Sequence, residues 1–172
     1  PVTSTKPRVS PAAHWASRGT SRLRSIGTDR VCKHRIARRL RLPVTTTLMG
    51  LGSFPETDEF SLGMLGMHGA IYANKAVDQA DMVISAAARF DDRVTGRVDT
   101  FARRAKVVHL DVDPAEHSKI VRADATAHGD LRLVLEQILE CIESRNWSKD
   151  FSKWRHAIYG WRQERPLPLK EG

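Results

Sequence analysis

The chain has 172 residues, of which 41% are hydrophobic and 28% charged, and its formal net charge at pH 7 is +8. This composition is typical of one soluble globular domain and excludes a large multidomain enzyme. No apolar run approaches the roughly 20 residues that a membrane-spanning helix needs. The positive charge is concentrated in residues 1–42, which hold eleven Lys and Arg against one acid, whereas residues 43–172 hold 17 against 19. The part expected to fold is therefore nearly neutral.

The first segment, residues 1–41, is rich in Ser, Thr, Pro and Arg and has little apolar periodicity, so it is predicted to be a disordered basic leader. Its composition also resembles an organelle transit peptide, and clustered arginines are one way to bind nucleic acid. Trp15 is the single Trp, Tyr or Phe there that could stack on a base, so the sequence does not favour a nucleic-acid partner.

Cys32 and Cys141 suggest neither a disulfide framework nor a metal motif, and Cys141 is expected to be a small core residue in a reducing cytoplasm.

A strand is predicted at residues 42–47, where β-branched residues accumulate. A loop with two glycines and a proline follows, and residues 70–80 are expected to form a helix of about three turns whose small side chains face a sheet. Gly66 and Gly69 come just before this helix. Their N–H groups could bind an anion such as pyrophosphate, although close packing of helix and strand explains the glycines equally well.

The apolar run at residues 82–88 predicts a buried strand that ends abruptly in Arg89 and Arg93, which bracket two aspartates. In an open α/β sheet, ligands bind just beyond the carboxyl ends of the strands. This loop is therefore a candidate ligand site. The alternative is a solvated turn with surface ion pairs.

The next predicted strand begins at Lys106 and turns acidic at its end. Asp111 is placed to accept hydrogen bonds from ribose hydroxyls, as acids do in dinucleotide-binding sheets. Asp113 could instead cap the turn that begins at Pro114, and the two roles are compatible. Residues 124–129 are expected to form a last short strand.

An amphipathic helix is predicted after Asp130, its N-cap, because apolar residues recur at three- and four-residue steps from Leu131 to Ile142. Three tryptophans spaced by seven residues predict one buried helical stripe in the tail: Trp147, Trp154 and Trp161. The order of elements indicates an α/β fold with a Rossmann-like, mainly parallel sheet flanked by helices.

Four motifs resemble, in order and spacing, those of acetolactate synthase (acetohydroxyacid synthase) large subunits, which are thiamine-diphosphate-dependent enzymes: residues 46–52, 64–69, 88–96 and 109–114. The resemblance covers about residues 42–165 and corresponds to the central of three domains. In that family the central domain binds FAD, and the outer two bind thiamine diphosphate with Mg²⁺. The enzymes decarboxylate pyruvate and join the two-carbon unit to a second 2-keto acid in branched-chain amino-acid biosynthesis, with no net redox role for FAD. They form homo-oligomers with a regulatory subunit.

The resemblance implies a set of FAD-binding residues that follow the predicted strands: Thr47, Leu48, Met49, Leu65, Gly66, Met67, His68, Ala88, Arg89, Asp91, Arg93, Val94, Asp111, Val112 and Asp130. It also implies that Asp92 and Arg93 lie near the substrate channel. Arginines supply forked donors for phosphate or carboxylate, and we expect the nearby aspartates to orient them.

Three departures from the family pattern shape the expected function. The apolar strand and glycine-rich turn that begin this domain are not found in residues 1–41, Ala87 replaces a glycine of many members, and no thiamine motif or activating glutamate occurs. We therefore expect an unrelated leader at 1–41, an incomplete FAD-binding domain at 42–145, and a Trp-rich helix with a linker at 146–172.

The sequence thus predicts a fragment of a catalytic subunit that is inactive alone and has no catalytic or metal-binding residues of its own. The alternative is a non-catalytic nucleotide-binding or interaction domain. A cytoplasmic location is expected, or a plastid for a plant source.

Overall fold

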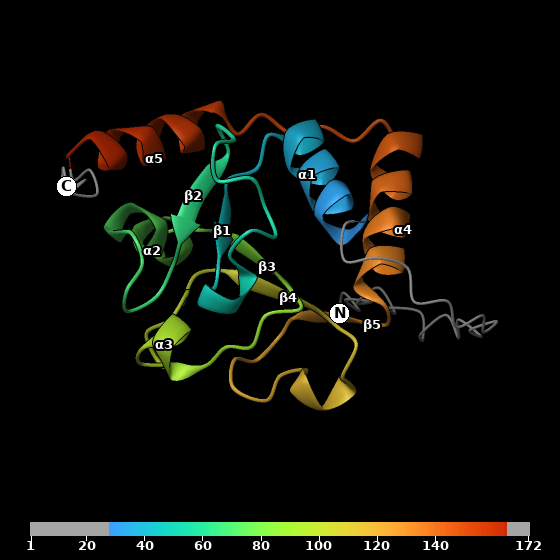
Figure 1. Ribbon diagram of the computed structural model, residues 1–172, viewed down its shortest axis with the longest axis horizontal. Coiled ribbons are helices and arrows are strands. Elements are labelled where there is room, and N and C mark those ends of the chain that lie inside the picture. Colours follow the sequence, from blue (N-terminus) through green and yellow to red (C-terminus); the bar gives the residue numbers. More distant parts are fainter. Residues whose placement is uncertain (1–27, 165–172) are drawn as a thin grey trace, which may run out of the picture.

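The computed structural model describes residues 28–164, which form an α/β fold (Figure 1). The elements in chain order are α1 (Thr28–Leu40), β1 (Val44–Thr46), the 3-10 turn η1 (Leu48–Gly50), β2 (Ser61–Met64), α2 (Ile71–Asp78), β3 (Met82–Ala86), α3 (Asp92–Thr95), β4 (Lys106–Asp111), the 3-10 turn η2 (Pro114–Glu116), β5 (Ala125–His128), α4 (Leu131–Ser144) and α5 (Ser152–Glu164). No helix among these residues is long and apolar enough to cross a membrane.

The described strands form one two-stranded sheet, β1-β2, and one three-stranded sheet, β3-β4-β5. Every neighbouring pair is parallel, and in the second sheet Ile84 pairs with Val108, which pairs with Ala125. Parallel neighbours place their carboxyl ends on one edge of each sheet. The prediction of a mainly parallel sheet flanked by helices is confirmed.

Helices α1 and α4 lie side by side over the three-stranded sheet (Figure 1), where Cys32, Leu110 and Leu135 form a buried cluster. Helices α2 and α5 cover the other part, where Ala73 and Ile158 belong to a second cluster. The predicted α4 is confirmed with its N-cap, because the Asp130 carboxylate accepts hydrogen bonds from two backbone N–H groups of the first turn. These contacts account for the amphipathic spacing of α4.

The structure corrects the prediction that residues 1–41 are disordered, because residues 28–40 form α1. Cys32, Ala37 and Leu40 are buried and Ile36 packs against the cluster that contains Cys32, so an apolar stripe exists at helical spacing. Most of the positions between these apolar residues are basic, so the overall composition of the segment did not reveal the stripe. Residues 1–27, the rest of the predicted leader, lie outside the described residues, as do residues 165–172.

Three smaller predictions are also corrected. Cys141 is exposed, whereas Cys32 is the buried cysteine. Trp147 precedes α5 and is exposed, so only two of the three tryptophans, Trp154 and Trp161, lie on the inward stripe of α5 with the buried Ile158. The rings of Trp154 and Trp161 are half-buried and meet edge to face at 5.5 Å. Helix α2 spans eight residues, about two turns, because its first turn starts only at Ile71.

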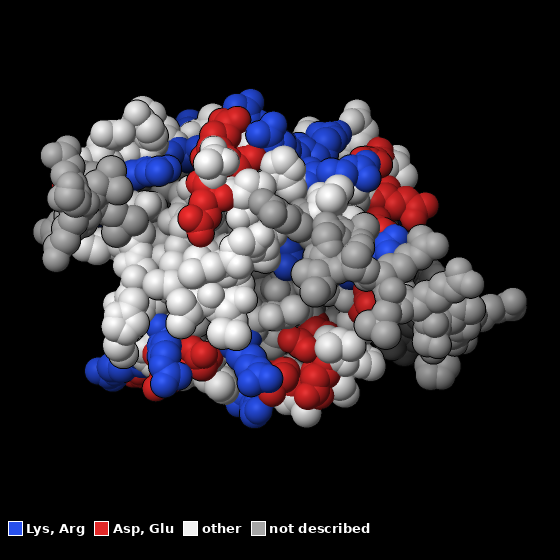
Figure 2. Space-filling view, in the orientation of Figure 1, with Lys and Arg blue, Asp and Glu red and all other residues white. Residues whose placement is uncertain are grey.

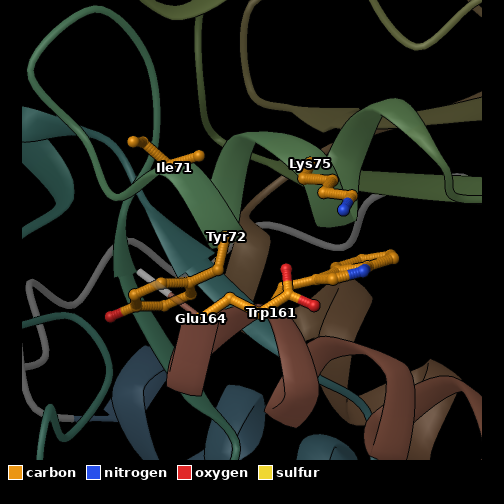
Figure 3. A pocket seen from close by; sticks show the side chains of 5 residues that line it. All are labelled: Ile71, Tyr72, Lys75, Trp161 and Glu164. Atoms are coloured by element: carbon orange, nitrogen blue, oxygen red, sulfur yellow. The ribbon is translucent and has the colours of Figure 1, made fainter. Parts of the chain in front are cut away.

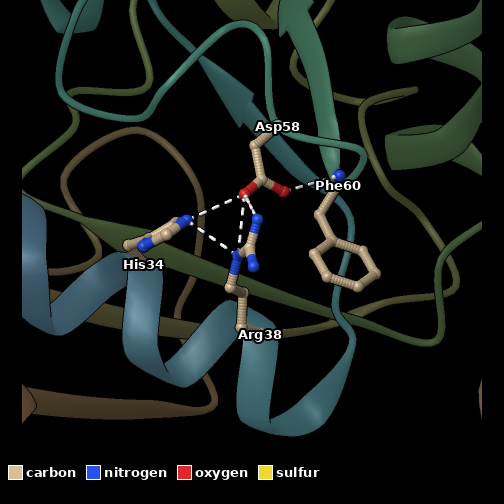
Figure 4. A network of polar contacts seen from close by, with 4 residues as sticks. All are labelled: His34, Arg38, Asp58 and Phe60. Carbon is tan, nitrogen blue, oxygen red and sulfur yellow. Dashed lines mark hydrogen bonds and ion pairs between the residues drawn. The ribbon is translucent and has the colours of Figure 1, made fainter.

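A polar network fastens α1 to the loop between β1 and β2 (Figure 4). The Asp58 side chain is 2% exposed, and its Oδ2 lies 2.8 Å from His34 Nε2 and 2.9 Å from Arg38 Nη2. Its Oδ1 accepts a hydrogen bond from the Phe60 N–H at 2.9 Å. Burial alone would raise the pKa of Asp58, but these partners outweigh burial and hold the pKa below its ordinary value of 3.8. The carboxylate therefore stays ionised and ties the helix to the sheet.

Candidate functional site

The structure brings the sequence-predicted residues to the carboxyl ends of the strands. Residues 47–49 follow β1, residues 65–68 follow β2 and residues 88–94 follow β3, while Asp111 ends β4 and Asp130 follows β5. The two sheets are joined at this edge, because the N–H of Met67 donates a hydrogen bond to the carbonyl of Arg93 at 2.8 Å. The carboxyl ends of parallel strands are the usual place for ligands in α/β folds. These loops form the candidate site.

Large apolar side chains are exposed at this edge. Met49 is 94% exposed, and Leu48, Met67 and Val112 also present most of their surface to solvent. In Figure 2 an uncharged area over η1 and the strands beside it is bordered below by charged side chains over α3. Exposed apolar groups gathered beside charges indicate a surface that another molecule covers.

The arginines of the loop after β3 remain accessible for an anion. Among residues 28–164, Arg89 makes no ion pair, and Arg93 Nη1 approaches Asp92 Oδ1 only to 4.0 Å, with both side chains mostly exposed. Asp91 does not orient them. Its carboxylate caps α3 by accepting a hydrogen bond from the Val94 N–H at 3.0 Å. The expected support of the arginines by Asp91 is therefore wrong, because helix capping uses this carboxylate.

Gly66 shows why the loop after β2 needs glycine. Its φ is +95°, and a Cβ built there would collide with the carbonyl of Arg93. Its N–H donates to Asn74 Oδ1 at 2.7 Å, and the N–H of Gly69 donates to the carbonyl of Gly66 at 3.0 Å. These N–H groups are engaged within the protein. The geometry thus favours close packing over anion binding by these glycines.

Asp111 is held in place at the end of β4. It is buried, its Oδ1 accepts a hydrogen bond from the Asp113 N–H at 2.9 Å, and its Oδ2 lies 3.8 Å from His109 Nε2. Asp113 caps η2 by accepting from the Ala115 N–H at 2.9 Å. The capping role proposed for Asp113 is confirmed. The turn fixes the orientation of Asp111 without using its Oδ2 in a hydrogen bond.

His109 is the first residue of the motif 109–114, but no role was predicted for it. It is 1% exposed, and neither ring nitrogen has a hydrogen-bond partner in the described part of the chain. Phe90 and His117 meet its ring edge to face at 5.2 and 5.4 Å. Burial lowers the pKa of His109 below its ordinary value of 6.5, and the charge of His117 lowers it further. Side chains alternate along a strand, so His109 lies on the same face of β4 as Val107. This alternation is the sequence signal that could have predicted the burial of His109.

Two hollows of the surface lie elsewhere. One, of about 290 Å³, lies between α2 and α5 (Figure 3), where Lys75 Nζ is 4.4 Å from the centre of the Trp161 ring. The other, of about 420 Å³, is lined by Asp78, Gln79, Arg103 and Arg104. No sequence-predicted site residue lines either hollow.

Comparison with known proteins points to one family. Residues 33–138 match the family model described as "Thiamine pyrophosphate enzyme, central domain". The chain is 48% identical over 147 residues to the acetolactate synthase large subunit of Parasynechococcus marenigrum (strain WH8102), a match that covers 83% of this chain and 24% of that protein. It is 47% identical over 131 residues to acetolactate synthase 1, chloroplastic, of Oryza sativa subsp. japonica, covering 75% of this chain and 20% of that protein. The chain thus spans a quarter or less of these relatives.

Proposed function

The chain belongs to the thiamine pyrophosphate enzyme central-domain family, and on that premise we propose that it is the FAD-binding central part of an acetolactate synthase catalytic subunit. One observation carries the proposal. Exposed apolar side chains, among them Met49 and Met67, and Arg89, which makes no ion pair within residues 28–164, all follow the carboxyl ends of parallel strands. An amphipathic ligand with flat rings and an anionic group matches this surface.

The residues present fit FAD. Leu48, Met49 and Met67 offer apolar surface for its ring systems, and Arg89 and Arg93 offer forked donors for its pyrophosphate. Asp111, whose buried carboxylate the turn already orients, suits hydroxyl groups. FAD supplies no net oxidation or reduction to the condensation. The role of these residues is to bind and orient the cofactor and to keep water from its apolar face.

The complete reaction, condensation of pyruvate with a second 2-keto acid, is proposed for the whole enzyme. The chain covers no more than 24% of the relatives compared above and carries no thiamine-binding motif, so we expect no turnover of pyruvate by this chain alone. Thiamine diphosphate and Mg²⁺ belong to other parts of such an enzyme. Asp92 and Arg93 are mostly exposed, which suits a proposed position beside a substrate channel formed with another domain.

Partners and location extend the same proposal. We propose that the whole enzyme is a homo-oligomer with a regulatory subunit and that it works in the cytoplasm, or in a plastid if its source is a plant. Relatives named chloroplastic support the second location.

A titration of the purified chain with FAD, followed by flavin fluorescence, tests the binding proposal. Replacing Arg89 and Arg93 together with Ala should weaken binding at least about tenfold, because hydrogen bonds to charged groups contribute about 1.5–3 kcal/mol each. The double replacement of Arg103 and Arg104, exposed arginines away from this edge, is the matched control and should leave affinity unchanged.

Absence of any FAD binding, or equal losses in both double variants, would contradict the proposal. Stronger binding of ADP or NAD than of FAD in a competition titration would support the non-catalytic nucleotide-binding alternative. Measured turnover of pyruvate by the chain alone would refute the expectation of inactivity.

A further inference from the structure

The side chain of Asn74, on α2, binds the main chain of one residue of the candidate site from both sides of its Cα. Its Oδ1 accepts a hydrogen bond from the Gly66 N–H at 2.7 Å, and its Nδ2 donates to the Gly66 carbonyl at 2.9 Å. A carboxamide carries a donor and an acceptor in one plane, so it can pair with a residue much as a neighbouring strand would. Asn74 therefore joins α2 to the loop that follows β2.

The N–H of Gly66 depends on this side chain. Gly66 is buried, and within residues 28–164 its N–H has no acceptor other than Asn74. Its carbonyl has a second partner, the Gly69 N–H at 3.0 Å. A buried N–H without a partner is unfavourable, so removal of the Asn74 amide should shift Gly66 toward water. The position of the loop after β2 is thus set in part by a side chain of α2.

Gly66 and Met67 also contact the main chain of the loop after β3. A Cβ built on Gly66 would collide with the carbonyl oxygen of Arg93, and the N–H of Met67 donates to that same oxygen at 2.8 Å. Helix α3 ends at Thr95, so this carbonyl takes its partner from the loop after β2 rather than from a longer helix. A chain of contacts therefore runs from Asn74 through Gly66 and Met67 to Arg93.

This chain of contacts connects two parts of the fold that each supply a group for a ligand. Met67, whose side chain is 70% exposed, follows β2 of the two-stranded sheet, and Arg93 follows β3 of the three-stranded sheet. A shift of the loop after β2 would change the spacing between this apolar side chain and this cation. A ligand that contacts both groups requires a fixed spacing.

We propose that Asn74 is a positioning residue of the candidate cofactor site, where it holds Gly66 and so sets Met67 against Arg93. This role rests on the proposed function, because FAD is the ligand that both side chains would contact. Asn74 acts through the main chain of the loop. Groups that are held in place before binding lose less conformational freedom when the ligand arrives, so the side chain should tighten FAD binding.

One test needs no cofactor. Asn74→Asp keeps the size of the side chain and the acceptor for Gly66, but it loses the donor and places an oxygen against the Gly66 carbonyl. Hydrogen exchange of the full chain by NMR should show the Met67 amide, which bonds to Arg93, exchanging about tenfold faster in this variant. Gln79→Ala is the matched control, because it removes an exposed side-chain amide at the end of the same helix, and it should leave Met67 unchanged.

Titration with FAD, followed by flavin fluorescence, separates positioning from stability. Asn74→Asp should weaken FAD binding about tenfold because the loop is no longer held in the binding geometry. Asn74→Leu removes both polar groups without adding a charge, so a similar loss in this variant excludes simple repulsion of FAD by the new carboxylate. Asp58→Asn removes contacts before the start of β2, at the opposite end of that strand, and should lower stability without changing FAD affinity.

Four outcomes overturn the proposal. The first is unchanged exchange of Met67 in both Asn74 variants. The second is loss of affinity in Asn74→Asp alone, which repulsion explains, and the third is an equal loss in Asp58→Asn, which general destabilisation explains. The fourth is FAD binding that is equally tight in the unaltered chain and in both Asn74 variants. An unaltered chain that binds no FAD would instead contradict the proposed function and, with it, the cofactor role of Asn74.

Discussion

Replacing Asp58 with Asn should destabilise the fold by about 2 kcal/mol, because it removes the charge that holds α1 to the β1–β2 loop. Asn keeps an oxygen that can accept the Phe60 N–H, whereas the charge-assisted contacts to His34 (2.8 Å) and Arg38 (2.9 Å) are lost. Breaking a fully buried ion pair costs about 3–5 kcal/mol. The Arg38 side chain is 57% exposed, so solvent screening reduces the effect here.

Urea unfolding followed by circular dichroism measures this loss, with Glu59→Gln as the control at an exposed neighbouring carboxylate. A loss of this size corresponds to a fall of about 4–8 °C in the melting temperature. Hydrogen exchange should show α1 opening more often in the Asp58 variant than in the control.

The dependence on pH gives a second check. The pKa of Asp58 is lowered in the folded state, so its stabilising contribution is present above the ordinary value of 3.8 and is lost as the pH falls through the lower folded pKa. The difference between the unaltered chain and Asp58→Asn should be constant from pH 7 to about pH 5 and shrink below pH 3.8. Equal stability at pH 7, or a difference that persists unchanged to the acid limit, would refute the reasoning.

Three further perturbations test the backbone and the buried histidine. Ala87→Gly should stabilise the chain by about 0.5–1 kcal/mol in urea unfolding, because Ala87 has φ of +53°, whereas Ala88→Gly, at a position without positive φ, should destabilise it. Gly66→Ala should cost about 2–4 kcal/mol because the added Cβ meets a backbone carbonyl, and Gly52→Ala, with positive φ but open space, should cost about 1 kcal/mol. Burial lowers the pKa of His109, so stability should decline as the pH falls below 6.5, and a smaller decline in His109→Gln would confirm its source.

The predictable part of the fold is the part with strong local patterns. Helix α4 was predicted with its N-cap Asp130 because apolar residues recur at helical steps, and β3 was predicted as a strand because its apolar run is short. The expectation that this strand is buried was wrong, because Ser85 is its only buried residue. The strand ended at Ala86, two residues earlier than the apolar run suggested. Ala87 adopts a left-handed conformation there, which apolar character does not reveal.

Helix α1 was missed because composition averages over the faces of a helix. Its apolar stripe consists of Cys32, Ile36, Ala37 and Leu40, and most of the intervening positions are basic. Such a helix is stable chiefly through tertiary packing. Its partners, Leu110 and Leu135 in one cluster and Phe54 in another, come from distant parts of the sequence. No local pattern supplies that information.

In the candidate site, the sequence predicted where the loops lie in the fold, but it did not predict the hydrogen-bond partners of their side chains. The loop after β3 does lie at the carboxyl end of its strand, as the apolar run and the following charges predicted. Whether Asp91 bonds an arginine or a backbone N–H depends on where α3 starts, and the sequence left that open. Ala87 was singled out because a glycine is common there, with crowding of a cofactor as the expected reason. The structure supplies a different reason, the positive φ of Ala87.

The exposed apolar side chains fall into two groups with a related physical origin. Met82 and Ile84 are exposed along an edge of β3 that no described strand covers, and Leu48, Met49 and Met67 are exposed in loops that leave β1 and β2 at their carboxyl ends. The first group belongs to a strand edge without a described neighbour, and the second group belongs to loops of the candidate site. In the loops, exposed apolar side chains beside charged ones are typical of a surface that another molecule covers.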